Sequence, residues 1–366
     1  MKGRAEIVGG GFAGLTAACA LAQRGWRVRV HERADRLRTA GAGINIYQNG
    51  LRVLEAVGAA DETLRDGARH LTRETRDQHD RLLSTHPWNI PVYGVLRQRM
   101  VDALAAAARR AGAEIITGSE GMKATPAGEL TLATGERMEA DLIVAADGVN
   151  SRIRDGLGLV AHRRFLADGA IRMLIPKLDP TEASDGRTIE YWSGSRRFLY
   201  NPCDTRQLYL AVTMLHSDAQ ARAVPVDKAL WTRTFPHLAP LIERIGDVAR
   251  YDRFEYIRLK RWSAGKVAVI GDAAHAIPPN IGQGAGCAMM NALSLAVHLE
   301  KSDLAAWERN ERPLTNHTQR ISLFLGMPTF WPAPLRSMFH SLAGRSTWLT
   351  AQRTRTARHI PTGTTS

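Results

Sequence analysis

The feature that most constrains the fold is a glycine-rich turn near the start of the chain. A short apolar strand, 5–8, leads into the pattern G-x-G-x-x-G, and an alanine-rich helix is expected to follow to about Gln23. In such a turn Gly9 permits the tight bend, Gly11 lets a phosphate approach the backbone, and Gly14 lets the helix pack closely on the strand. The pattern predicts a strand–turn–helix unit that holds a phosphate-bearing ligand at the helix N-terminus.

A second strand, 27–32, completes this unit and ends in Glu32. A carboxylate at this place accepts hydrogen bonds from ribose hydroxyls, so the unit predicts an adenine-dinucleotide site. A glycine turn with a purely structural role would explain neither Glu32 nor the start of the helix. The motif by itself does not distinguish FAD from NAD.

The chain is longer than one core usually holds, because its 366 residues favour two or three packed subdomains. Helical periodicity in the first 162 residues changes to strand-like runs over 163–260 and returns over 261–325. We therefore expect an α/β dinucleotide-binding domain from 1–162 and 261–325, with a small sheet inserted at about 69–96. A mainly antiparallel substrate-binding sheet is expected at 163–260, and a helical, basic tail at 326–366 with its last six or seven residues disordered.

Composition narrows the classes of partner. The sequence has no run of about 18 apolar residues, so we expect no transmembrane helix, and no signal peptide is evident. Three widely spaced cysteines form no metal-binding pattern, and free thiols suit a reducing cytoplasm. The net charge is +13, but the arginines are dispersed, so we expect no nucleic-acid or membrane partner. The positive field would instead attract a dinucleotide, a nicotinamide cofactor and an acidic substrate.

Two later segments decide between the dinucleotides. An apolar strand at 140–146 ends in Asp147, and Ser151 is placed to cap a short helix that follows. A second apolar strand, 266–270, ends in the pair Gly271-Asp272, and the proline- and glycine-rich loop 278–286 then leads into a long helix.

With the opening turn, these segments resemble the three fingerprints of the class A flavoprotein monooxygenases, the para-hydroxybenzoate hydroxylase superfamily. The resemblance runs from Ala5 to about Arg312. A single G-x-G-x-x-G fits this family, in which the nicotinamide cofactor docks transiently. The resemblance implies a Rossmann-like FAD-binding domain of the GR2 type, with FAD as cofactor, NADH or NADPH as transient co-substrate, and O2.

The family pattern also implies residue roles. Asp272 would accept a hydrogen bond from a ribityl hydroxyl, the loop 282–286 would present backbone N–H groups to the flavin, and Pro279 would lie at the flavin face where oxygen reacts. Arg97 would reach ribityl or phosphate oxygens, unless it is a solvated residue at a helix start; for Asp147 a structural role is an equal alternative. The implied cofactor-binding set is Gly9, Gly11, Phe12, Ala13, Gly14, Glu32, Arg33, Gly43, Arg97, Met122, Asp147, Arg172, Asp272, Gly282, Gln283, Gly284, Ala285 and Gly286.

Within the superfamily the chain resembles the 2-methyl-3-hydroxypyridine-5-carboxylate oxygenase group. Met290-Asn291 stands where the wider family usually has Glu-Asp, and this departure is shared with the pyridine-ring enzymes. In that group the residues matching Arg197 and Tyr209 lie over the substrate. Arg73 falls where the group has a substrate-side tyrosine, which puts the identity of the substrate in doubt but not its class.

The resemblance implies that reduced FAD reacts with oxygen to give a C4a-hydroperoxide, which attacks an electron-rich ring. The expected activity is hydroxylation, with possible ring opening, of a hydroxylated pyridine or other aromatic carboxylate. Arg197 would pair with the carboxylate or phenolate, and Tyr209 would hydrogen-bond the substrate. Alternatively, Arg197 is an exposed strand residue and Tyr209 a core aromatic residue.

Two other functions compete with this interpretation. A flavin-dependent reductase or halogenase would keep the fold, but a halogenase is expected to carry W-x-W-x-I, and the tryptophans here occur singly. A non-enzymatic basic binding protein would be expected to lose the flavin motifs, which are all present. The sequence leaves the oligomeric state open.

Overall fold

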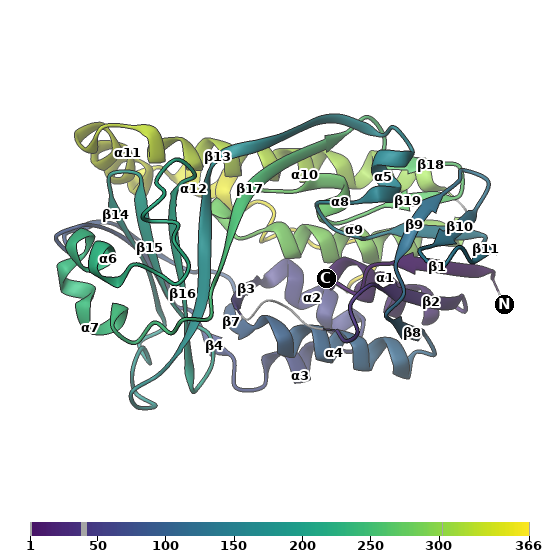
Figure 1. The fold of residues 1–366 in the computed structure, drawn as a ribbon, viewed down its shortest axis with the longest axis horizontal. Coiled ribbons are helices and arrows are strands. Elements are labelled where there is room, and N and C mark those ends of the chain that lie inside the picture. Colours follow the sequence, from purple (N-terminus) through teal and green to yellow (C-terminus); the bar gives the residue numbers. More distant parts are fainter. Residues whose placement is uncertain (1, 38–41, 302, 366) are drawn as a thin grey trace.

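The structure is a computed structural model that describes residues 2–37, 42–301 and 303–365. The described chain is built around two large sheets, a mainly parallel one at the right of Figure 1 and a mainly antiparallel one at the left. The architecture is therefore α/β with an inserted antiparallel sheet, as predicted. None of the described helices combines the length and apolarity that crossing a bilayer requires.

The mainly parallel sheet carries the glycine turn. Its strands lie in the order β18 (Ser263–Ala264), β19 (Val267–Val269), β12 (Leu142–Ala145), β1 (Arg4–Val8), β2 (Arg27–Glu32) and β8 (Glu114–Thr117). Only the β18–β19 pair is antiparallel. Strands β12 and β19 are buried at every position, which explains their continuous apolar sequences.

Helices with small side chains pack beside this sheet. α1 (Phe12–Ala22) contacts both α4 (Arg97–Arg110) and α9 (Gly284–His298). Ala17 and Ala18 of α1 are fully buried, and their methyl side chains allow this close packing. Three further helices extend the layer, since α2 (Gln48–Ala56) and α10 (Leu304–Gly326) contact α9 and α3 (Ala60–Leu64) contacts α4. Two short helices lie elsewhere: α5 (Arg152–Gly156) contacts strand β9 (Gly121–Ala124), and α8 (Asp272–His275) contacts strand β17 (Arg250–Leu259).

The second large sheet has seven strands. Their order is β17 (Arg250–Leu259), β13 (Val160–Pro176), β16 (Gln207–Leu215), β15 (Arg196–Pro202), β14 (Arg187–Ser193), β5 (Thr72–Asp77) and β6 (Leu82–Pro87). Residues on one face of the sheet form a core with α6 (Lys228–Thr234) and α7 (Ala239–Ile242), centred on the buried Trp231 and Phe235. The long strands β13 and β17 run side by side toward the mainly parallel sheet (Figure 1).

The expectation of one small sheet at about 69–96 is wrong. This segment divides between two sheets: β4 (Ala68–Arg69) and β7 (Val92–Leu96) join β3 (Gly43–Tyr47), whereas β5 and β6 extend the seven-stranded sheet. The β5–β14 pairing is parallel and joins residues more than 100 positions apart. Local turn signals cannot reveal such a pairing.

The C-terminal segment is also more ordered than expected. After α10 it forms α11 (Ala333–Arg345) and α12 (Thr347–Thr354), and the chain then returns to α9 and α10. Gly363 packs against Leu293 of α9, and the Thr362 hydroxyl donates a 2.9 Å hydrogen bond to Glu311. The predicted disorder is therefore wrong as far as residue 365; residue 366 lies outside the described residues.

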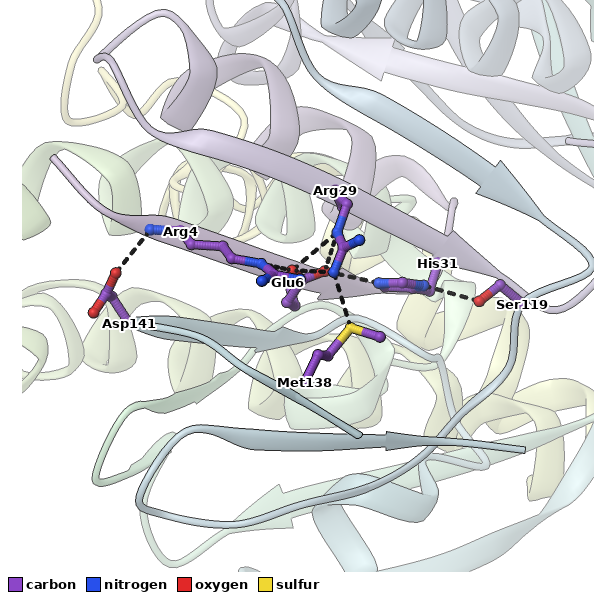
Figure 2. A network of polar contacts seen from close by, with 7 residues as sticks. All are labelled: Arg4, Glu6, Arg29, His31, Ser119, Met138 and Asp141. Carbon is purple, nitrogen blue, oxygen red and sulfur yellow. Dashed lines mark hydrogen bonds and ion pairs between the residues drawn. The ribbon is translucent and has the colours of Figure 1, made fainter. Parts of the chain in front are cut away.

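A buried acidic residue joins the first two strands (Figure 2). Glu6 of β1 is completely buried, and its carboxylate accepts a 2.9 Å hydrogen bond from Arg29 of β2 and lies 2.8 Å from Nε2 of His31. The other ring nitrogen of His31 lies 2.8 Å from the Ser119 hydroxyl. Figure 2 shows these side chains between the first two strands and Met138, which belongs to the sheet formed by β9 (Gly121–Ala124), β10 (Glu129–Leu132) and β11 (Arg137–Glu139). The network therefore ties the strand before the glycine turn to its neighbour.

Replacing Glu6 with Ala tests the contribution of this network. The change leaves Arg29 and His31 without their shared acceptor, so the free energy of unfolding should fall by about 3 kcal/mol. Chemical denaturation of the variant and of Glu114→Ala, an exposed acid on β8, gives the comparison. Equal stability of the two variants would contradict the assigned role.

Candidate active site

The glycine turn brings the first helix into direct contact with the first strand. A Cβ on Gly14 would lie 2.0 Å from the Gly9 carbonyl oxygen, and one on Gly9 would lie 2.3 Å from the Ala146 carbonyl oxygen. Gly9 also has φ of +106°, which L-residues with side chains rarely adopt. Gly11, in contrast, has no atom within 4 Å of an added Cβ. The protein thus needs Gly9 and Gly14 for its own packing, whereas at Gly11 it keeps a space that suits an approaching phosphate.

Glu32 is fixed at the end of β2 beside the turn. Its Oε2 accepts a 2.8 Å hydrogen bond from the Gly10 N–H, and its Oε1 accepts a 3.0 Å bond from the Ala34 N–H. Arg33 next to it is exposed. Met122 lies on β9, and its sulfur is 3.6 Å from the guanidinium nitrogen of Arg152. These positions suit the adenosine end of a dinucleotide, and their ligand contacts stay a prediction.

Asp147 holds the turn that follows β12. Its Oδ2 accepts a 3.1 Å hydrogen bond from the Arg152 N–H, while its buried Oδ1 has no partner among the described residues. Ser151 caps α5 as predicted, accepting from the Arg154 N–H. The buried Arg154 side chain donates to the carbonyl oxygens of Val149 and Ala273, at 3.0 and 3.2 Å, and so ties this turn to the strand end that carries Asp272.

A cavity of about 410 Å³, called here the flavin cavity, unites most of the predicted site. It lies between the glycine turn, the loop 277–285 and the near face of the seven-stranded sheet. Predicted residues that line it are Gly11, Phe12, Ala13, Gly43, Arg97, Arg172, Arg197, Tyr209, Asp272, Pro279, Gly282, Gly284 and Ala285. The lining does not include the described residues Gly9, Gly14, Glu32, Arg33, Met122, Asp147, Gln283 and Gly286.

Charged groups are arranged around the cavity. Asp272 is exposed to the cavity but enclosed by protein, and this burial raises the pKa of its carboxyl group against the opposing effect of Arg97 and Arg172. Arg97 lies 5.0 Å from the centre of the Phe12 ring, and burial lowers its pKa. Arg172 donates a 3.2 Å hydrogen bond to Asp252. Arg97 and Asp272 therefore offer a donor and an acceptor at the same cavity wall.

The loop 277–285, called here the flavin loop, combines glycines with a helix N-terminus at the cavity wall. Gly282 adopts a left-handed conformation with φ of +66°, and an added Cβ would lie 2.7 Å from the Tyr47 hydroxyl oxygen. Gln283 is held by Asn49, whose side-chain N–H donates to Gln283 Oε1 at 3.0 Å. The buried Gln283 Nε2 has no partner among the described residues, and an added Cβ on Gly284 would meet no atom within 4 Å. Open backbone at the N-terminus of α9, where Gly284 lines the cavity, fits the carbonyl-rich edge of a flavin.

The residues that depart from the wider family pattern have structural partners. Asn49 lies 3.5 Å from the Met290 sulfur, and the Asn291 amide lies 2.9 Å from Nε2 of His275. Burial lowers the pKa of His275 to about 4, so this histidine is neutral at physiological pH. Met290 therefore contacts the residue that holds Gln283, and Asn291 contacts His275 just before the flavin loop.

Arg197 reaches the cavity with its charge already balanced. Only 4% of the residue is exposed, and its guanidinium donates to Asn280 at 2.9 Å, pairs with Asp168 at 3.3 Å and lies 3.6 Å from Glu190. The alternative of an exposed strand residue is therefore wrong. Its Nε is buried and has no partner among the described residues. The pairing with a substrate carboxylate stays a prediction.

Tyr209 and Gly43 are in contact where β3 approaches the seven-stranded sheet. Tyr209 of β16 lines the flavin cavity with 8% exposure, and an added Cβ on Gly43 would lie 2.5 Å from the Tyr209 Cβ. Gly43 therefore allows β3 to approach β16. Tyr209 belongs both to a small apolar cluster and to the cavity wall, so the two roles considered from the sequence coexist.

Several residues of the site were not predicted from the sequence. Asp168 and Glu190 neutralise Arg197, Asn49 holds Gln283, and Trp88 and Arg353 line the cavity. No local motif marks these residues, because each reaches the site through long-range packing. Arg73 was noted as a departure, and it forms a 2.6 Å ion pair with Glu190.

Substitutions of Gly11 and Gly14 can separate the effect of the turn on cofactor binding from its effect on folding. Gly11→Ala should change the stability of the apoprotein by at most about 1 kcal/mol but weaken FAD binding, because the methyl group enters the phosphate space. Gly14→Ala should destabilise even the apoprotein, because its Cβ would overlap the Gly9 carbonyl. Thermal unfolding without FAD and titration with FAD measure the two effects. Unchanged FAD affinity in Gly11→Ala would contradict this assignment.

A neighbouring pair of arginines tests the role of Arg197. Arg197→Met leaves Asp168 in a buried position without its cation, so we expect a loss of about 3 kcal/mol in unfolding free energy with retention of FAD. Arg196→Met is the control, since Arg196 pairs with Asp218 in a more exposed position and should lose at most about 1 kcal/mol. Two equally stable variants would show that the buried pair is unimportant.

Comparison with known proteins agrees with this site. A family model described as an FAD binding domain matches residues 4–314. A 2-heptyl-3-hydroxy-4(1H)-quinolone synthase of Mycobacteroides abscessus is 41% identical over 94% of this chain and 96% of its own. A 6-hydroxynicotinate 3-monooxygenase of Bordetella bronchiseptica is 27% identical over 88% of this chain and 91% of its own.

Among solved structures, a tetrameric form of 2-methyl-3-hydroxypyridine-5-carboxylic acid oxygenase has a TM-score of 0.87 and 39% identity, covering 99% of this chain and 98% of that one. The residues of the cavity fit FAD, and the family implies NAD(P)H and O2 as co-substrates. The chain therefore belongs to the FAD-binding-domain family of class A flavin-dependent monooxygenases, which act on aromatic compounds.

Proposed function

We propose that this monooxygenase oxygenates a hydroxy- or oxo-substituted N-heteroaromatic ring of the pyridine or quinolone type. The observation that carries the proposal is the flavin cavity, whose lining combines the loop before α9 with Arg197 and Tyr209. Two full-length relatives of about 40% identity support the ring class, because one is named for a hydroxyquinolone product and the other for a hydroxypyridine substrate.

When bound, FAD supplies the reduction of O2 and the transfer of an oxygen atom to the ring. The protein's own side chains prepare the ring for this transfer. The Tyr209 hydroxyl can hydrogen-bond a ring oxygen, and the arginines that line the cavity favour the deprotonated form of a ring hydroxyl. A ring with this charge is richer in electrons and reacts faster with an electrophilic oxygen.

The cavity walls also limit the access of water. Tyr209 and Ala211 of β16 and Ile277 and Ile281 of the flavin loop form apolar parts of the lining. Pro279 lies on the same loop, next to Asn280, which accepts the hydrogen bond from Arg197. The substrate side and the flavin side are thus linked by a direct contact between sheet and loop.

A substrate screen tests the proposal. The FAD-loaded protein should oxidise NADH or NADPH faster with hydroxypyridines, pyridine carboxylates or 4-quinolones than with benzene analogues that lack the ring nitrogen. Product mass then reports either one added oxygen with the ring intact or two with the ring opened. The proposal fails if only carbocyclic rings stimulate oxidation and acquire oxygen.

A further inference from the structure

A second, smaller cavity adjoins the flavin cavity and shares part of its wall. This side cavity of about 80 Å³ lies between β5, β6, β14 and the C-terminal helices α11 and α12. Both cavities are lined by Arg73, Trp88, Glu190, Arg197, Asn280 and Arg353. These shared residues mark the place where a substituent on a ring in the flavin cavity would extend.

Arg353 is the unusual member of this shared wall. It comes from α12, and among the described residues its guanidinium forms no hydrogen bond or ion pair. Arg73 is paired with Glu190 at 2.6 Å, and Arg197 is paired with Asp168 at 3.3 Å. Three guanidinium groups therefore face two carboxylates, and the positive charge that is left over belongs to Arg353.

The groups around Arg353 agree with its lack of an ion pair. Burial and the nearby Arg73 lower the pKa of Arg353 to about 9, which is the effect expected for a cation held in an enclosed and positive place. The Glu190 carboxylate has its pKa lowered by Arg73 and Arg197 in spite of burial, so it is already engaged. Burial lowers the pKa of His340, which also lines the side cavity, to about 4, so it adds no charge near neutral pH.

Trp88 links the shared wall to the flavin loop. It packs edge-on against Tyr47, at 5.5 Å between ring centres, and the Tyr47 hydroxyl lies beside Gly282 of the flavin loop. A ligand group next to Arg353 would therefore be close to the flavin side of the cavity.

We propose that Arg353, with Trp88 and the already paired Arg73 and Arg197 around it, forms a subsite for an oxyanion of the substrate, at the junction of the two cavities. This inference rests on the proposed function, because it assigns a group on the same ring. The oxyanion is either a ring carboxylate or a deprotonated ring hydroxyl. In both cases Arg353, and not Arg197, supplies the uncompensated charge.

Equilibrium binding to the FAD-loaded protein tests the subsite. The probes are pyridine-3-carboxylate, 3-hydroxypyridine and pyridine, and the signal is the change in the flavin absorption spectrum. We expect Arg353→Met to weaken binding of the anionic probe about tenfold or more and to leave pyridine binding unchanged, because only a charge-assisted contact is lost. Arg353→Lys should recover part of the loss.

Arg355→Met is the matched control, since Arg355 is exposed two residues further along and lines neither cavity. A selective effect on pyridine-3-carboxylate identifies a carboxylate subsite, and one on 3-hydroxypyridine, growing as its hydroxyl ionises, identifies a ring-oxyanion subsite. Equal affinities in Arg353→Met and Arg355→Met would overturn the inference. So would weaker FAD binding with unchanged probe affinity, because Arg353 would then serve the cofactor.

The test separates this inference from the proposed function. If the wild-type protein oxygenates N-heteroaromatic rings but Arg353→Met binds the probes normally, only the subsite is wrong. If the wild-type protein oxygenates none of them yet Arg353→Met loses affinity for the anionic probe, the subsite stands and the proposed ring class is wrong.

Discussion

The close contact between α1 and β1 is the constraint on which the rest of the structure depends. Gly14 meets the Gly9 carbonyl so closely that no side chain fits, and this places the N-terminus of α1 at the end of the parallel strands. The strand ends that carry Asp147 and Asp272 lie in register with it, and the buried Arg154 links them. A single edge of the sheet thus gathers groups that are predicted to hold the dinucleotide.

The flavin cavity lies where this edge meets the seven-stranded sheet. Arg197 donates a hydrogen bond to Asn280 of the flavin loop, so the sheet and the loop are in direct contact. The acidic residues Asp168 and Glu190 stabilise Arg197 in its buried position, but they also neutralise its positive charge. Binding of an anionic substrate therefore needs a further cation, and α12 brings Arg353 to the junction of the two cavities.

The parts of the structure that could be predicted from the sequence are those whose physical cause is local. The glycine turn, the Ser151 cap and the loop before α9 each combine special backbone geometry with neighbouring residues, and the structure has them where the sequence places them. The parallel pairing of β5 with β14 and the position of Arg353 depend on contacts between distant segments. The basic tail looked like a disordered end, because its burial against α9 leaves no periodic signal in its last residues.

The most direct test of the account is a crystal structure of the FAD-loaded protein with a bound hydroxypyridine or 4-quinolone. The account predicts that the flavin lies along Gly11, Asp272 and the 282–285 loop, and that the ligand ring lies between this loop and the Arg197–Tyr209 wall. A ligand bound outside the flavin cavity, with the flavin ring separated from Arg197 by protein, would contradict it.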